Sequence, residues 1–125
     1  MPTILIVDDD EHQQILFEEE LKDEGYDVVV AGGAREALDM VANTPPDLVV
    51  LDVAMPGMDG IEALGQLLAR NNRLPVILHT AYATYKDNFM TWSADAYVVK
   101  SSDLSELKSE IKRVLAKRSE EPPAQ

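Results

Sequence analysis

Five short runs rich in Val, Ile and Leu alternate along this chain with stretches whose apolar residues recur at helical spacing. The runs cover residues 3–8, 27–31, 47–52, 75–80 and 96–100. Their apolarity is continuous rather than alternating, which predicts parallel strands buried on both faces by helices. Strict alternation of strand and helix therefore predicts an α/β fold with a doubly wound parallel sheet.

The intervening stretches repeat apolar residues every three or four positions, as one face of a helix does. The repeating residues are Phe17 and Leu21; Ala34, Ala37, Leu38 and Val41; Ile61, Leu64, Leu67 and Leu68; and Leu104, Leu107, Ile111, Val114 and Leu115. Segment 81–93 carries mainly aromatic apolar residues and has poor helix signals. Residues 119–125 contain two Glu and two Pro, which predicts a disordered tail after one domain over 1–118.

The composition excludes several classes of function. A net charge of -12 would repel a phosphate backbone, so we expect no direct binding to nucleic acid. No stretch approaches the ~20 apolar residues that span a bilayer, so we expect no membrane insertion, and the first residues lack a secretory signal pattern. The chain has no cysteine, which excludes disulfides and thiolate catalysis. We therefore expect a cytoplasmic protein.

Polar residues stand at the carboxyl ends of four of the predicted strands: Asp8 and Asp9, Asp52, Thr80, and Lys100. Those ends share one edge of a parallel sheet, which is the edge where α/β proteins bind ligands. Three carboxylates brought together repel each other unless they hold a cation or are partly protonated, and a cation is the better fit. Oxygen ligands with few protein donors suit Mg²⁺, with Mn²⁺ as a substitute, and a phosphate often completes its coordination.

Asp52 differs from the acidic pair because it ends an apolar strand and precedes a loop rich in turn-forming residues, 55–60. A carboxylate in that place is open to attack on phosphorus and can form an acyl phosphate if cationic groups offset the added charge. Lys100 supplies a compact positive charge for a phosphoryl oxygen, and Thr80 supplies a hydroxyl donor. The pattern thus indicates phosphoryl chemistry centred on Asp52.

Four segments in order resemble the response regulator receiver domain of two-component signalling, the CheY-like family. They are residues 4–9 (ILIVDD), 51–60 (LDVAMPGMDG), Thr80 with Ala81, and 97–100 (YVVK). The resemblance extends over residues 3–117 and implies a flavodoxin-like fold of five parallel strands in the order 2-1-3-4-5. The chain departs from the family at Ser101, where a proline commonly follows the lysine, and in a slightly shorter segment between Thr80 and Lys100.

The resemblance also implies residue roles. Asp52 would accept phosphate from a sensor histidine kinase or phosphotransfer protein, while Asp8, Asp9, Asp52 and the backbone carbonyl of Ala54 would hold Mg²⁺. Lys100 and Thr80 would bind phosphoryl oxygens, and Thr80 and Tyr97 would switch a face that meets a partner.

Such a domain is a phosphoacceptor rather than an enzyme, with autophosphorylation from small donors and autodephosphorylation expected. We expect a monomer or weak dimer that acts through a separate effector protein.

Two other functions fit parts of the sequence. Asp8 and Asp10 match the Asp-x-Asp pattern of haloacid-dehalogenase-like phosphatases, with Asp8 as nucleophile and Asp10 as acid. That family usually carries a threonine or valine shortly after the second aspartate, where this chain has Glu11 and His12. A pseudo-receiver that only docks partners is the other alternative, and the intact set of acidic residues, threonine and lysine argues against it.

Overall fold

The computed structural model describes residues 2–52, 60–70, 73–80, 94–101 and 103–120. Within these residues five strands form one parallel sheet in the order β2-β1-β3-β4-β5. The strands are β1 (Thr3–Val7), β2 (Asp27–Ala31), β3 (Leu48–Leu51), β4 (Val76–Thr80) and β5 (Ala96–Val99). The helices are α1 (Glu11–Asp23), α2 (Ala34–Asn43), α3 (Gly60–Arg70) and α4 (Ser105–Glu120). The predicted sheet and strand order are confirmed.

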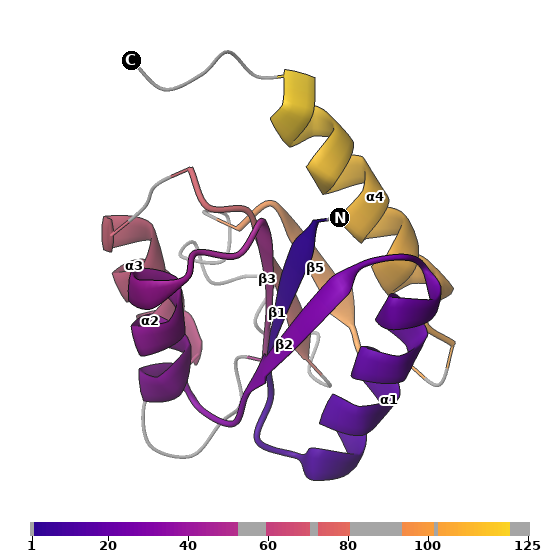
Figure 1. Ribbon diagram of the computed structural model, residues 1–125, viewed down its shortest axis with the longest axis horizontal. Helices are drawn as coiled ribbons and strands as arrows, with labels where there is room; N and C mark the ends of the chain where they lie inside the picture. The colour runs from indigo at the N-terminus through magenta and orange to yellow at the C-terminus, as the bar shows by residue number, and fades with distance from the viewer. Residues whose placement is uncertain (1, 53–59, 71–72, 81–93, 102, 121–125) are drawn as a thin grey trace.

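The sheet lies between two helical layers, with α2 and α3 on one face and α1 and α4 on the other (Figure 1). Alternate residues of each strand point to opposite faces. In β1, Leu5 and Val7 belong to the core cluster beneath α2 and α3, whereas Ile4 and Ile6 belong to the cluster beneath α1 and α4. All four are at most 1% exposed, so the apolar run of β1 fills two cores.

Burial on both faces was the wrong expectation for β2. In this strand Asp27 and Val29 are exposed, Val28 and Val30 are half-buried, and Ala31 is buried. β2 forms one edge of the sheet and pairs only with β1 among the described strands. The helical layers cover the centre of a twisted sheet better than its edge, so an apolar edge strand keeps part of its surface in water.

Helices α1 and α4 begin at acidic caps. The carboxylate of Asp10 accepts hydrogen bonds from the backbone N–H groups of His12 and Gln13 and so caps the start of α1. The Asp103 carboxylate accepts hydrogen bonds from the hydroxyl of Ser105 at 2.6 Å and from the N–H of Ser105 at 2.9 Å. The bond from the hydroxyl, and then the bond from the N–H, lower the pKa of Asp103. α4 continues through Glu120, two residues into the expected tail.

Two aspartates that precede strands tie neighbouring strands together. The Asp47 carboxylate accepts a hydrogen bond from the N–H of Thr3 at 2.7 Å, and the Asp95 carboxylate accepts one from the N–H of Val76 at 3.0 Å. In both pairs the backbone N–H of the aspartate also donates to the carbonyl of its partner. These double contacts hold the amino ends of the strands in register, opposite the edge that carries the polar residues.

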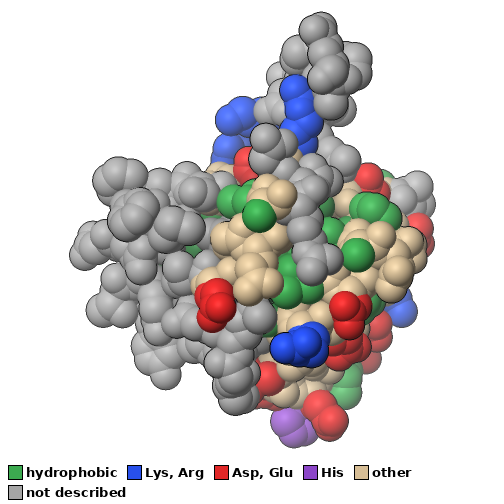
Figure 2. Space-filling view, turned by 90° about the vertical axis from the view of Figure 1, so that its left-hand side faces the viewer, with side chains coloured by type: hydrophobic (Ala, Val, Ile, Leu, Met, Phe, Trp, Pro, Cys, Tyr) green, Lys and Arg blue, Asp and Glu red, His purple; other side chains and the backbone are tan. Residues whose placement is uncertain are grey.

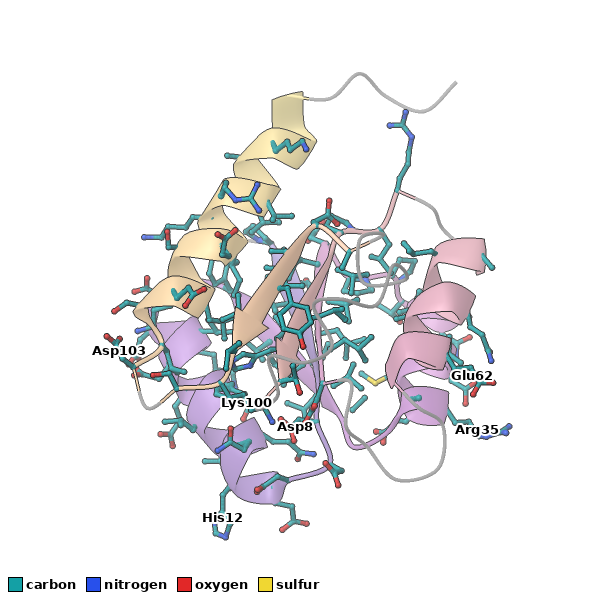
Figure 3. The ribbon with its side chains drawn as sticks, turned by 180° about the vertical axis from the view of Figure 1, so that it is seen from behind. Asp8, His12, Arg35, Glu62, Lys100 and Asp103 are labelled. Carbon is teal, nitrogen blue, oxygen red and sulfur yellow. The ribbon has the colours of Figure 1, made fainter. Side chains whose placement is uncertain are left out.

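The surface reflects the acidic composition. In Figure 2 the acidic side chains on the visible face gather in its lower part, while most of the basic ones lie toward the top. The lower part is the end of the molecule at which Figure 3 places Asp8 and Lys100. No helix in the described ranges is both long and apolar enough to cross a bilayer.

Candidate phosphoacceptor site

The predicted polar residues meet at the carboxyl edge of the sheet. Asp8, Asp52 and Lys100 directly follow β1, β3 and β5, and Thr80 is the last residue of β4. The expected strands that end in Asp8, Asp52 and Lys100 each stop one residue earlier in the structure, and β3 also begins one residue later than expected. The N–H groups of these three residues still complete the ladder, donating to the carbonyls of Ala31, Val7 and Thr80 respectively. The parallel sheet therefore brings them together, as predicted.

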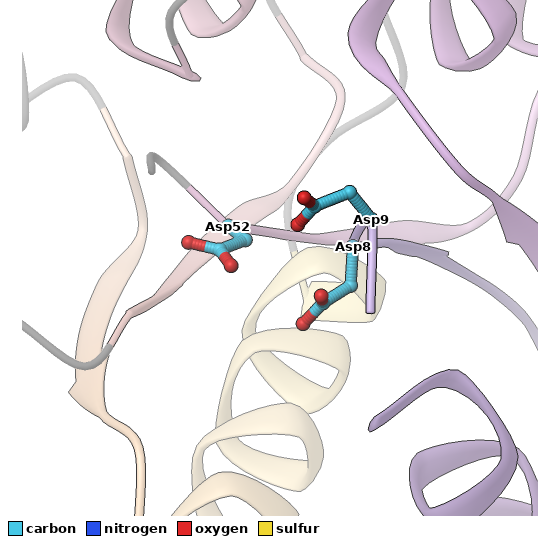
Figure 4. Close-up of side chains that lie close together, drawn as sticks. All are labelled: Asp8, Asp9 and Asp52. Carbon is cyan, nitrogen blue, oxygen red and sulfur yellow. The ribbon is translucent and has the colours of Figure 1, made fainter. Parts of the chain in front are cut away.

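Three carboxylates form the centre of the site (Figure 4). Asp8, Asp9 and Asp52 each offer one oxygen, and these oxygens all lie within 4.8 Å of one another. The ligands of an octahedral Mg²⁺ lie ~2.1 Å from the ion, so adjacent ligands are ~3 Å apart and opposite ligands are ~4 Å apart. A small adjustment of the side chains would therefore bring the three oxygens to these separations. An all-oxygen, anionic donor set is also the chemistry that Mg²⁺ prefers. The residues therefore fit a magnesium ion.

The two members of the acidic pair differ in exposure. Asp8 is 1% exposed and Asp52 is 6% exposed, whereas Asp9 lies at the surface. Buried carboxylates must be paired or bound to a cation, because desolvation of an isolated charge costs several kcal/mol. The side chain of Asp9 points over the rim of the site toward Asp52 (Figure 4). This arrangement leaves the cluster open to solvent on the side of Asp9.

Lys100 bridges the buried carboxylates. Its Nζ lies 2.7 Å from Oδ2 of Asp8 and 2.9 Å from Oδ2 of Asp52. Burial alone would lower the pKa of Lys100, but the hydrogen bonds and charges of the two aspartates together outweigh it and the pKa is raised. The ammonium is thus held charged beside Asp52, where it can attract phosphoryl oxygens.

Thr80 and Tyr97 lie on the neighbouring strands. Thr80 is fully buried at the end of β4, and its carbonyl accepts the backbone hydrogen bond of Lys100 at 2.6 Å. Tyr97, in β5, is half-buried and packs against the core cluster beneath α2 and α3. The expected ligand carbonyl of Ala54 and segment 81–93 lie outside the described residues. The peptide bond between Lys100 and Ser101 is trans, as are the others that the structure describes.

A histidine is buried in the strand that leads to Thr80. His79 in β4 is 2% exposed, and its ring centroid lies 4.9 Å from that of Phe17 in α1. Burial, and then the charge of Lys100, lower its pKa to about 4, although Asp8 acts in the opposite direction. His79 is therefore neutral at pH 7 and belongs to the core beneath the site.

Sequence reasoning missed the contact that Gln14 makes with the site. Its side-chain amide donates a hydrogen bond to the backbone carbonyl of Asp8. No residue pattern indicates this contact, because an amide on a helix carries no specific chemistry and its partner is a backbone atom six residues earlier. Only the angle between β1 and α1 brings the two groups together.

Comparisons with known proteins agree on the family. The response regulator receiver domain matches residues 4–112. The Thermotoga maritima response regulator TrrA, crystallised with Mg²⁺ and BeF, is 40% identical, with a TM-score of 0.89 over 91% of this chain and 99% of that one. The structure of TrrA in complex with the histidine kinase ThkA also matches, with 41% identity and a TM-score of 0.87. This match covers 92% of the present chain and 99% of the matched one.

Among curated relatives, the sporulation initiation phosphotransferase F of Bacillus subtilis is 36% identical over 93% of this chain and 95% of its own length. The regulatory protein AtoC of Escherichia coli is 38% identical over 90% of this chain. The chain spans only 25% of AtoC, and about half of the response regulator MprA from Mycobacterium species. Together with the geometry of the site, these matches show that the chain belongs to the response regulator receiver domain family.

Proposed function

We propose that this chain is a phosphorylation-controlled switch that accepts a phosphoryl group on the carboxylate of Asp52. The observation that carries the proposal is the meeting of three carboxylate oxygens within 4.8 Å with the ammonium of Lys100, 2.9 Å from Asp52. An anionic carboxylate can attack an anionic phosphoryl group only if nearby cations offset the negative charge that gathers there. This site combines the nucleophile with one fixed cation and a set of ligands for a second.

In the proposed reaction an oxygen of Asp52 attacks phosphorus in line with the leaving group. A P–O bond to Asp52 forms while the P–N bond of a phosphohistidine, or the P–O bond of an acyl phosphate, breaks, and the leaving group keeps the electron pair. Lys100 and Thr80 would contact the transferred oxygens. Asp8, Asp9, Asp52 and the carbonyl of Ala54 would hold Mg²⁺, or Mn²⁺, which offsets the charge that gathers on the phosphoryl group.

The contacts of Asp8 and Asp10 bear on the phosphatase alternative, in which Asp8 would be the nucleophile. Both carboxylate oxygens of Asp8 accept hydrogen bonds, one from the N–H of Asp10 at 2.9 Å and one from Lys100. The carboxylate of Asp10, which a phosphatase of the haloacid-dehalogenase type would use as its acid, instead accepts hydrogen bonds at the start of α1. These contacts do not support the phosphatase alternative.

The phosphodonor, we propose, is a histidine kinase or a phosphotransfer protein, because the similar TrrA forms a complex with a histidine kinase. A cavity of about 610 Å³ beside Lys100 is lined by Asp10, Gln13, Leu16 and Ser101 as well as the lysine. Leu16 is 41% exposed and its neighbour Ile15 is 56% exposed. Exposed apolar side chains next to a reactive site suit a partner protein that must approach Asp52.

Thr80 and Tyr97 would transmit phosphorylation to a separate effector protein through rearrangement at β4 and β5. The receiver domain would extend over 1–118, act in the cytoplasm as a monomer or weak dimer, and lose its phosphate by autodephosphorylation.

The test is intact mass spectrometry after incubation with acetyl phosphate and Mg²⁺. We expect the wild type to gain the mass of one phosphoryl group and Asp52→Asn to gain none, because an amide cannot act as the nucleophile. Omission of Mg²⁺ should also prevent the gain. A wild-type mass that stays unchanged with Mg²⁺ present would refute the proposal, and phosphate on Asp52→Asn would place the acceptor elsewhere.

A further inference from the structure

Asp8 is held through its backbone as well as through its side chain. Its N–H donates to the carbonyl of Ala31 at 3.1 Å, and its carboxylate oxygens accept from the N–H of Asp10 and from Lys100. The side-chain amide of Gln14 supplies the remaining contact, a hydrogen bond to the carbonyl of Asp8. Every polar group of Asp8 is thus engaged, and the contact from Gln14 orients the peptide that joins Asp8 to Asp9.

Gln14 is well placed to hold that peptide rigidly. It lies in α1, where its own N–H donates to the carbonyl of Asp10 at 3.0 Å, and its side chain is half-buried. The amide nitrogen also lies beside Gly32, because a Cβ built on that glycine would come within 3.7 Å of it. A side chain confined by its helix and by the loop after β2 has few other rotamers open to it, so its hydrogen bond costs little entropy.

We propose that Gln14 is a positioning residue for the metal site. By fixing the Asp8 carbonyl it sets the plane of the Asp8–Asp9 peptide, and hence the directions in which the carboxylates of Asp8 and Asp9 leave the backbone. Groups that orient metal ligands strongly affect metal affinity without touching the ion. The inference rests on the proposed function, since it concerns the Mg²⁺ ligands of that site.

An amide suits this position for an electrostatic reason. The carbonyl of Asp8 needs a donor, and a carboxylate in place of Gln14 would direct acceptor lone pairs at it beside three anionic groups. A lysine or arginine would supply a donor but would add a positive charge close to a cation site that already contains Lys100. Gln14 donates a hydrogen bond without changing the charge of the site.

The test measures Mg²⁺ binding by isothermal titration calorimetry for the wild type, Gln14→Met and Gln14→Ala. Methionine has the length and helix propensity of glutamine without the donor, whereas alanine also removes the packing. We expect both variants to bind Mg²⁺ about threefold to tenfold more weakly and to an equal extent. Gln66→Met makes the same change in α3 and should bind like the wild type.

A second readout reports the hydrogen bond directly. The NMR shift of the Asp8 carbonyl carbon, recorded without Mg²⁺, should move in both Gln14 variants and stay unchanged in Gln66→Met. Wild-type affinity in Gln14→Met would overturn the inference, and weaker binding in Gln14→Ala alone would assign the effect to packing rather than to the donor. If the wild type itself binds no Mg²⁺, the proposed function fails together with the inference.

Discussion

The ammonium of Lys100 lies 2.9 Å from Oδ2 of Asp52, and the two residues are 48 positions apart in the sequence. The same nitrogen reaches Asp8, so one cation from the end of β5 joins carboxylates from the ends of β1 and β3. Because these contacts raise the pKa of Lys100 above its ordinary value of 10.5, its stabilising effect is present below that pH. It is lost only as the pH rises through the raised pKa.

Replacing Lys100 should make the metal-free protein less stable and more responsive to Mg²⁺. Lys100→Met leaves two buried carboxylates without their cation, which should lower the free energy of unfolding in EDTA by about 2 kcal/mol. Mg²⁺ should then stabilise the variant more than the wild type, since the lysine no longer offsets the charge of the carboxylates or repels the metal ion. Urea unfolding with EDTA or Mg²⁺ measures both effects.

The control for Lys100 is Lys112→Met. Lys112 is 65% exposed on α4 and lies 3.6 Å from Glu24, so its loss should change stability by less than about 0.5 kcal/mol. Equal effects of Mg²⁺ on Lys100→Met and the wild type would contradict this electrostatic link between the lysine and the metal.

His79 should contribute to acid destabilisation. Its pKa falls from 6.5 to about 4 on folding, so the unfolded chain binds the additional proton between these values. The contribution of neutral His79 to the free energy of unfolding is therefore fully present above about pH 6.5 and is lost as the pH falls toward 4. The wild type should lose about 2 kcal/mol of unfolding free energy through this residue between pH 7 and pH 5. His79→Phe, which keeps a ring against Phe17, should not show this part of the loss.

Urea unfolding at the two pH values measures this difference. His12→Gln is the matched control, because His12 is exposed in the first turn of α1 and its replacement should leave the wild-type dependence on pH. An identical pH dependence in His79→Phe and the wild type would show that the proton is taken up elsewhere.

Asp9 should matter for the metal and not for the fold. Its carboxylate is exposed, so Asp9→Asn should change the free energy of unfolding in EDTA by no more than about 0.5 kcal/mol. Mg²⁺ affinity, measured by calorimetry, should fall about tenfold or more because a ligand is lost. In the control Asp10→Asn the new side chain still caps α1, and Mg²⁺ should bind nearly as in the wild type. A similar loss in both variants would indicate a general effect of charge.

The exposed apolar side chains of α1 should affect the rate of phosphotransfer from protein donors but not from small molecules. Leu16→Ala should slow phosphotransfer from a kinase or phosphotransfer protein about fivefold, because truncating an apolar side chain that packs against a partner would cost about 1 kcal/mol. The rate with acetyl phosphate should not change. Val29→Ala, an exposed apolar residue of the edge strand β2, serves as the control for the kinase assay. Loss of both activities in Leu16→Ala would point to damage within the site itself.

The sequence by itself determined the class of fold and the location of the chemistry. Continuous apolar runs such as residues 4–7 indicate strands of a sheet covered on both faces, and their alternation with helical patterns indicates parallel strands. Because parallel strands share one carboxyl edge, Asp8, Asp52, Thr80 and Lys100 could be placed together from their positions alone. These inferences depend on local periodicity, which can be read directly from the chain.

Only the tertiary structure decided how those residues interact. Strand order and register bring Lys100 to Asp8 across 92 positions, and the path of the chain after β1 buries Asp8 while it exposes Asp9. The angle between β1 and α1 brings Gln14 to the Asp8 carbonyl, and the edge position of β2 leaves Val29 partly in water. Such contacts join side chains to groups that are distant or carry no pattern, so they depend on packing in three dimensions rather than on local sequence.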